Sequence, residues 1–278
     1  MADVFHTGTV HLTAIRPEIW AASFEQTLKE ALPFNDLIAR DYQGTISALG
    51  DIVNISLFPQ FAAATVMANE DDHQDAAAIT VSTVQLNINK MIVQDFVVTD
   101  KAKIQTLEHA NMLKDLAFFS IMKEMQAQII AIIAPAVANA ISYDVGTTLA
   151  LADLLEAKEL LDTGLVPLEG RKLVLDMPQL NDLWGITGFL SRDYIPTGSP
   201  LTTGQMPQTI LGSELRATTE ASAVTYNFHP SFAQVAVQKA LGVEVFNLGV
   251  TGYRGVRTNC SLLMGTVQVY DDRVVSIS

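Results

Sequence analysis

The sequence has few aromatic residues, few charges and a single cysteine. Aromatic residues make up 7% and charged residues 17% of the 278 positions. One cysteine, Cys260, cannot form an internal disulfide. The 17 Lys and Arg are outnumbered by 30 Asp and Glu, and the formal net charge of -13 has the wrong sign for a protein that mainly grips phosphate. Direct readout of nucleic acid is therefore disfavoured.

Targeting and membrane signals are also missing from the sequence. Residues 1–10 have neither the basic flank nor the apolar core of a signal peptide, which predicts a cytoplasmic origin. Residues 125–143 carry no charge, but their apolar part, 129–138, is interrupted by Pro135. A membrane helix needs about 20 mainly apolar residues. A buried helix is therefore favoured over a membrane span.

The apolar content, in contrast, is high. Apolar residues make up 49% of the chain and the mean hydropathy is +0.26. This excludes global disorder and provides a core for one large domain or two modest ones. It is also unusual for a monomer that must cover itself with polar surface. Burial at subunit interfaces would explain the excess.

The first helical pattern lies near the N-terminus. Residues 16–33 place Trp20 and Phe24 among apolar residues at helical spacing, and Pro33 ends the pattern. This short amphipathic helix belongs to no obvious domain. It could pack on another subunit or fold back on its own core, and both interpretations stay open.

Two strand patterns follow, separated by an acidic stretch. Apolar and polar residues alternate in 50–59 and again in 79–98, where Val84, Leu86 and Ile88 share one face. The simplest arrangement is a long hairpin whose tip carries three acidic residues: Asp71, Asp72 and Asp75. Because a two-stranded hairpin is marginal in water, it should need a partner surface.

The middle of the chain has helical periodicity. Apolar residues recur at three- and four-residue spacing over 104–134, which predicts a long amphipathic helix that Pro135 kinks or ends. A second helix is expected over 151–162, with Gly164 just past its end. Residues 171–178 then read as a core strand.

The last part of the chain returns to loop and strand patterns. Residues 185–213 are rich in Gly, Pro, Ser and Thr, which predicts a long loop. Strands are expected over 223–228, 262–270 and 273–277, the last two forming a hairpin across the turn at 271–272. No internal repeat or low-complexity linker divides the chain.

No catalytic, cofactor or metal site is indicated. Asp162-Thr163-Gly164 matches an aspartic-protease tripeptide, but it ends a predicted helix instead of lying in a loop between strands. The cluster of Asp71, Asp72, His73 and Asp75 could bind a divalent cation, yet it lacks the glycine and glutamate of a calcium loop. Cys260 has no nucleophile signature and is expected to be a small buried apolar residue.

The order of these segments resembles the major capsid proteins of tailed bacteriophages, which share the Hong Kong 97 fold with encapsulins. The similar segments span nearly the whole chain. They are RPEIWAASFEQTLKEALPFNDLIARDY, GDIVNISLFP, VQLNINKMIVQDFVVTD, LLEAKELLDTGLVPLEGRKLVLDMPQLNDL, TILGSEL and GTVQVYDDRVVSI.

The resemblance implies an α+β fold with four parts. Residues 1–42 would form an N-terminal arm with its helix, and 43–100 an extended β-hairpin loop. A peripheral domain with a long spine helix and a sheet would comprise 101–148 and 214–278. An axial α/β domain would comprise 149–213, with a possible extension to about residue 255.

The function implied is that of a shell subunit and not an enzyme. Pentamers and hexamers would form an icosahedral shell around double-stranded DNA in the virion, assembled in the bacterial cytoplasm. The start of the chain at the arm implies a separate scaffolding protein. A portal protein, a possible decoration protein and weak nonspecific contact with packaged DNA are the other expected partners. No cofactor and no membrane are expected.

Candidate subunit-interface residues come from the arm and the hairpin, which lack a core of their own. They are Trp20, Phe24, Asp71, Asp72, Asp75, Val84, Leu86 and Ile88. Two alternatives stay open for the chain as a whole. An encapsulin-like compartment would share the fold, and a soluble hydrolase or metal-binding enzyme would form a small oligomer with a titratable pocket.

The acidic hairpin tip generates a first prediction. Changing Asp71, Asp72 and Asp75 together to lysine should leave the subunit folded, since the tip adds nothing to its core, but should block or misdirect shell formation. Exposed ion pairs are worth only about 0 to 1 kcal/mol each, yet a shell repeats them in every subunit. Circular dichroism should be unchanged while negative-stain images show free capsomers or aberrant particles. Normal shells would mean that the tip is only a solvated surface.

Overall fold

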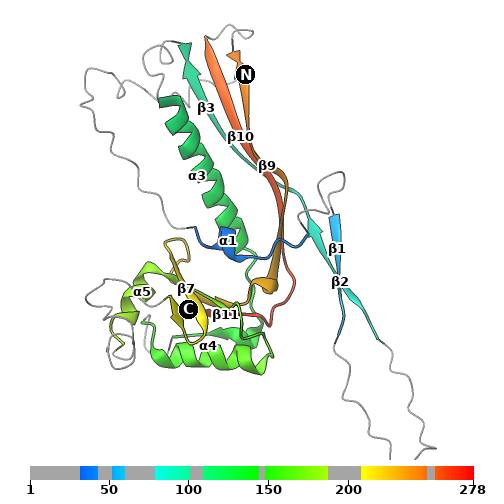
Figure 1. The fold of residues 1–278 in the computed structure, drawn as a ribbon, viewed down its shortest axis with the longest axis vertical. Helices are drawn as coiled ribbons and strands as arrows, with labels where there is room; N and C mark the ends of the chain where they lie inside the picture. Colours follow the sequence, from blue (N-terminus) through cyan, green and yellow to red (C-terminus); the bar gives the residue numbers. More distant parts are fainter. Residues whose placement is uncertain are drawn as a thin grey trace, which may run out of the picture.

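The computed structural model describes residues 32–42, 52–59, 79–100, 109–143, 148–186, 208–248 and 254–278. These residues form two bodies and a hairpin (Figure 1). The long body consists of a helix that lies along a narrow three-stranded sheet. The lower body contains a six-stranded sheet with helices packed on it. The hairpin lies beside the point where the two bodies meet.

The long body is held together by one helix face. Helix α3, His109–Ile130, lies against β3 (Lys90–Thr99), β10 (Gly255–Gln268) and β9 (Ala233–Asn247), which form an antiparallel sheet in the order β3-β10-β9. The helix buries four apolar residues at intervals of four: Ala117, Ile121, Met125 and Ile129. This spacing places them on one face, as the sequence periodicity predicts.

The predicted helix over 104–134 is confirmed over its described part. It ends at Ile130, however, and a turn follows, so the helix stops before it reaches Pro135. The charge-free stretch 125–143 therefore contains the end of α3, a 3-10 turn (Val137–Asn139) and the short strand β4 (Ala140–Ile141). Within the described ranges no helix has both the length and the hydropathy of a membrane span.

The lower body contains the six-stranded sheet β4-β11-β8-β5-β7-β6. Its remaining strands are β5 (Lys172–Asp176), β6 (Thr209–Ile210), β7 (Ser213–Thr218), β8 (Thr225–Phe228) and β11 (Val274–Ile277). Helices α4 (Leu151–Thr163) and α5 (Met177–Leu183) belong to this body. Leu173 and Leu175 lie in one core cluster with the buried residues of α4, whereas Val174 lies in the core shared with α3. Both sheet faces are covered, which explains why β5 is an almost unbroken apolar run.

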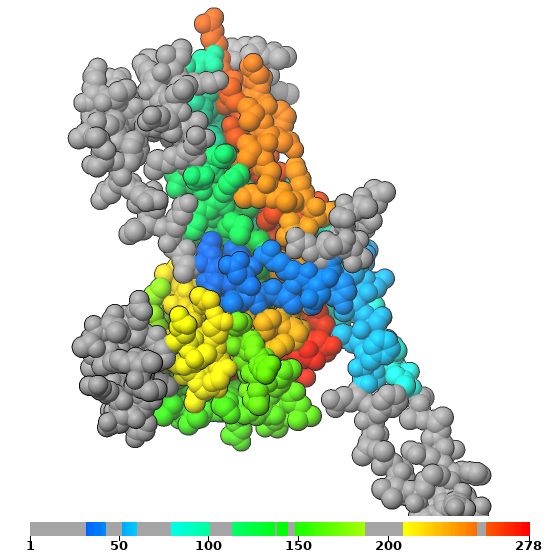
Figure 2. All heavy atoms as spheres, in the orientation of Figure 1, coloured from blue at the N-terminus to red at the C-terminus, as the bar shows by residue number. Residues whose placement is uncertain are grey.

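The two bodies meet at a cluster of aromatic rings. Phe34, in the short helix α1 (Phe34–Leu37), is fully buried, and its ring centroid lies 5.7 Å from that of Phe228 and 5.8 Å from that of Tyr226. Phe232, in a 3-10 turn (Pro230–Phe232), lies 5.0 Å from Phe228. Figure 2 shows residues 32–42 in blue as a band across the waist of the molecule.

Hydrogen bonds fix this band to both neighbours. The Asn35 side chain donates to the Met122 carbonyl of α3 over 2.9 Å. Ala39 forms a parallel bridge with Gln234 at the start of β9. The Gln234 amide donates to Asp41 over 2.9 Å and its oxygen accepts from the Asp41 backbone. Residues 32–42 therefore contact partners that lie 87 and 193 positions further along the sequence.

The predicted hairpin is confirmed, but its second strand is shorter than expected. β1 (Ile52–Leu57) pairs antiparallel with β2 (Ser82–Asn87), from Ile52 opposite Asn87 to Leu57 opposite Ser82. The tract 79–98 is not one strand, because the chain leaves the hairpin after Asn87 and enters β3 at Lys90. At this crossing a Cβ on Gly265 would lie 2.4 Å from the Asn87 carbonyl oxygen, so only glycine fits.

The C-terminal hairpin prediction is wrong. β10 pairs with β3 and β9 in the long body, whereas β11 pairs with β4 and β8 in the lower body. The turn at 271–272 therefore links two sheets, not two neighbouring strands. The loop predicted over 185–213 lies mostly outside the described residues, and its last part forms β6 and the start of β7.

Helix α4 and strand β5 agree with their predictions, with one difference at the helix end. Gly164 caps α4, but with φ -72° it is not in the left-handed conformation. Leu165 adopts that conformation instead, at φ 55°. A leucine in this region is strained, because its Cβ crowds the following carbonyl.

The aromatic junction leads to a second prediction. Phe34→Ala should lower the free energy of unfolding by about 3 to 5 kcal/mol, because it leaves a cavity between the two bodies. Phe58→Ala is the matched control, since that ring is 75% exposed and its loss should change stability by less than about 0.5 kcal/mol. Urea unfolding of both variants measures the difference. Equal effects would show that Phe34 does not stabilise the junction.

Candidate assembly surfaces

Part of the hairpin face predicted for a neighbour is covered within this chain. Leu86 is fully buried and Ile88 is 6% exposed. With Ile55 they pack against Ala236 and Leu263, which belong to β9 and β10 of the same molecule. These two residues are therefore core residues of the subunit, which corrects their assignment as interface candidates. The sequence pattern identified the buried face but not the surface that buries it.

The remaining interface candidates have different outcomes. Val84 is half-buried on the same face of β2. Trp20, Phe24, Asp71, Asp72 and Asp75 lie outside the described residues and stay predictions. Toward the tip, beyond the paired residues, the described hairpin ends expose three large apolar side chains: Phe58, Ile79 and Val81. The apolar surface available to a neighbour thus lies nearer the tip than predicted.

A second apolar surface lies on the long sheet, on the face opposite α3. Opposed residues of an antiparallel pair share a face, so Val97, Arg257 and Phe246 form one row across the three strands. Val97 is 40% exposed and Phe246 50% exposed, and Met91 and Val93 continue the same face along β3. The ion pair between Asp95 and Arg257 lies within this surface. Exposed apolar patches of this kind are typical of sites that bind another protein.

A third surface lies at the end of α4. Leu165 is 76% exposed and Leu168 is 65% exposed in the turn between α4 and β5. The turn is held by Arg171, which is only 2% exposed and donates to the carbonyls of Val166 and Pro167 over 2.7 Å and 3.0 Å. We call residues 164–170 the leucine turn. A buried arginine and a strained backbone thus hold two leucines out in solvent.

Electrostatics around the leucine turn do not indicate catalysis. Asp162 accepts hydrogen bonds from Lys158 and from Arg171, both over 2.6 Å. Both bonds lower the pKa of Asp162 below its ordinary value, and the bond from Lys158 has the larger effect. The carboxylate is therefore ionised and fully paired. The tripeptide 162–164 ends a helix, as predicted, and Asp162 stabilises the turn.

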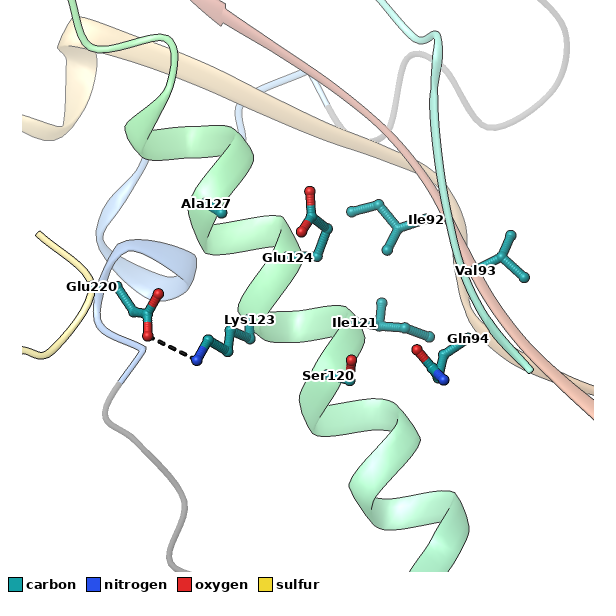
Figure 3. Close-up of a pocket in the computed structure, with 9 residues that line it drawn as sticks. All are labelled: Ile92, Val93, Gln94, Ser120, Ile121, Lys123, Glu124, Ala127 and Glu220. Carbon is teal, nitrogen blue, oxygen red and sulfur yellow. Dashed lines mark ion pairs between the residues drawn. The ribbon is translucent and has the colours of Figure 1, made fainter. Parts of the chain in front are cut away.

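The remaining candidates for chemistry are Cys260, groups that could bind a metal ion, and one groove. Cys260 is fully buried, and burial raises the pKa of its thiol, as expected for a core residue. Among the described residues no group of His, Cys, Asp and Glu is placed to hold a metal ion. A groove of about 370 Å³ lies between α3 and β3 (Figure 3). Lys123 in this groove is paired with Glu220 over 2.9 Å.

Comparison with known proteins defines the class of fold. No protein-family model matches the sequence, and no curated protein sequence matches it. Solved structures do. A chain of Mycobacterium phage Che8 matches with TM-score 0.75 and 22% identity over 94% of this chain and 96% of that one.

Two cyanophage structures agree with this match. A chain from the capsid structure of cyanophage P-SCSP1u has TM-score 0.75 at 14% identity, over 93% of this chain and 91% of that one. A chain from the capsid asymmetric unit of cyanophage Pam1 has TM-score 0.73 at 13% identity, over 100% and 98%. The chain thus has the α+β fold of phage capsid chains. The predicted Hong Kong 97-like capsid fold is confirmed by these matches, which cover 93% to 100% of this chain.

The leucine turn leads to a third prediction. Leu165→Gly should leave the free energy of unfolding unchanged or raise it by up to about 1 kcal/mol, because glycine relieves the left-handed strain at little cost in burial. Leu168→Gly removes a similar side chain from an unstrained position and should lower that free energy by about 0.5 to 1 kcal/mol. Thermal melting separates the two variants.

Both variants should nevertheless assemble into oligomers less readily than the unmodified chain, as measured by light scattering against protein concentration. Assembly defects in both variants, despite their different effects on the free energy of unfolding, would show that the leucines contact another subunit. Normal assembly of both variants would remove the leucine turn from the set of interface surfaces.

Proposed function

We propose that this chain is the major capsid protein of a tailed bacteriophage, which assembles through pentamers and hexamers into an icosahedral shell around double-stranded DNA. The observation that carries the proposal is the extent of the structural match. Chains from several phage structures superpose on nearly the whole of this chain, and this chain covers nearly the whole of them. A shared domain on an unrelated protein would match only in part.

The surfaces described above support a structural role over an enzymatic one. Among the described residues, exposed apolar side chains gather near the hairpin tip, on the long sheet and in the leucine turn. Monomeric proteins rarely expose several such patches. A shell subunit would cover them with neighbours, which also accounts for the positive mean hydropathy.

The domain division that we propose follows the two bodies. The lower body, residues 140–228 with 274–277, would be the axial domain. The long body, with α3 as spine helix and residues 90–130 and 233–268, would be the peripheral domain. The axial domain thus continues past residue 213, but it ends before β9 and does not reach 255. Residues 1–42 and the hairpin would be the arm and the extended loop.

Partners and location follow from the same proposal. A separate scaffolding protein, a portal protein and a decoration protein would contact the shell, which forms in the host cytoplasm and becomes the virion capsid. Contact with DNA should be weak and lost at moderate salt, because the net charge is -13 and Arg257 is already paired with Asp95.

Assembly is the decisive test and the fourth prediction. The purified chain, with candidate scaffolding protein from the same genome added, should sediment as capsomers and closed particles. Electron microscopy should show pentamers and hexamers on the particle surface. A stable monomer or dimer under all these conditions would overturn the proposal. Closed shells that enclose an enzyme instead of DNA would indicate an encapsulin-like compartment.

A further inference from the structure

His229 lies where the chain passes from the lower body to the long body. Only residues 229–232 separate the end of β8 from the start of β9. A second connector, residues 269–273, runs between β10 and β11 beside the first. The His229 backbone donates to the Arg273 carbonyl over 3.1 Å, and Val269 and Tyr270 both donate to the Phe232 carbonyl. The two connectors therefore form one joint between the bodies.

The His229 side chain fastens this joint. Its Nδ1 accepts a hydrogen bond from the Ser231 backbone over 3.3 Å and lies 2.7 Å from Ser231 Oγ. Arg273 of the other connector donates to the same Oγ over 2.8 Å, and its guanidinium lies 3.6 Å from the Tyr270 ring centroid. Since the Ser231 backbone N–H donates to Nδ1, this nitrogen acts as an acceptor, and Ser231 Oγ can donate its hydrogen to it as well. This arrangement requires an unprotonated Nδ1.

The surroundings of the ring oppose a positive charge. Arg273, Arg171 and Lys172 all act on His229 as cations, and the backbone of Glu169 supplies the one hydrogen bond that favours protonation. Asp162 and Glu214 are paired with Arg171 and Lys172 respectively. Burial, followed by the Arg273 charge, lowers the pKa of His229 below its ordinary 6.5. The neutral ring is the form that fits the closed joint.

We propose that His229 is an acid-sensitive clasp that sets the angle between the two bodies. When Nδ1 gains a proton, it can no longer accept from Ser231, and the new imidazolium is repelled by Arg273. The connector 229–232 then loses this side-chain contact with 269–273, and the angle between the bodies is less tightly fixed. No shell is required for this behaviour, so it can be tested whether or not the proposed function is correct.

The direction of the pH effect follows from proton linkage. The closed form binds the proton less readily than an opened or unfolded form, where the pKa returns toward 6.5. The clasp therefore contributes its full stabilisation above about pH 6.5, and this contribution is lost as the pH falls toward the lowered pKa. Acidification opens the joint, and neutralisation closes it.

Distance measurement between the bodies tests the clasp directly. Spin labels are placed on Leu155→Cys in α4 and Val245→Cys in β9, both exposed positions, with Cys260→Ala removing the native thiol. Pulsed electron resonance on the purified full chain then compares about pH 7.5 with about pH 5. We expect a narrow distance distribution at the higher pH and a shifted or broadened one at the lower pH.

Two variants identify the group responsible. His229→Asn retains a short side-chain acceptor that can cap Ser231 but does not titrate, so its distribution should stay narrow at both pH values. His109→Asn, at another histidine of the sequence, should keep the acid response of the unmodified chain. Circular dichroism at each pH confirms that the chain is folded. An unchanged distribution in the unmodified chain, or an equal acid response in His229→Asn, would overturn the proposal.

Discussion

Burial of one aromatic ring where two sheets meet is the constraint on which this architecture depends. Neither body covers all of its own apolar surface. The six-stranded sheet leaves Val174 and Phe228 without cover on one face, and the lower end of α3 needs a surface as well. Phe34 enters this gap, and Asn35 and Gln234 bond the same band to the helix and to β9. The short segment 32–42 thus converts two incomplete layers into one continuous core.

Local sequence patterns correctly predicted the elements whose surroundings stay the same along their whole length. α4 and β5 have one consistent environment along their length, so periodicity and apolar content identified them. The alternation of 50–59 and 79–98 correctly indicated a hairpin with one buried face, although its second strand ends at Asn87. The ends of elements were less predictable. α3 stops at Ile130 without a proline, and the left-handed residue after α4 is a leucine, because the tertiary contacts of Arg171 determine that turn.

What could not be predicted depends on partners distant in sequence. Residues 262–270 and 273–277 have the spacing of a hairpin. Val274 nevertheless pairs with Phe228 in the six-stranded sheet, which does not contain β10. Strand β9 was missed because its first residues are buried on both faces while its later residues are exposed, so no single period runs through it. Among the candidate interface residues, alternation marked Leu86 and Ile88 as buried but could not show that the covering sheet belongs to the same chain.

The position of β11 has a consequence for synthesis. This strand follows every other strand in sequence, yet in the sheet it lies between β4 and β8, and β4 has no other strand partner among the described residues. While the chain is still on the ribosome, the sheet of the lower body therefore exists in two parts. Residues 274–277 must leave the exit tunnel before these parts can join. A nascent chain that has not yet exposed residues 274–277 therefore cannot complete the lower body, and it is excluded from any contact that requires this body.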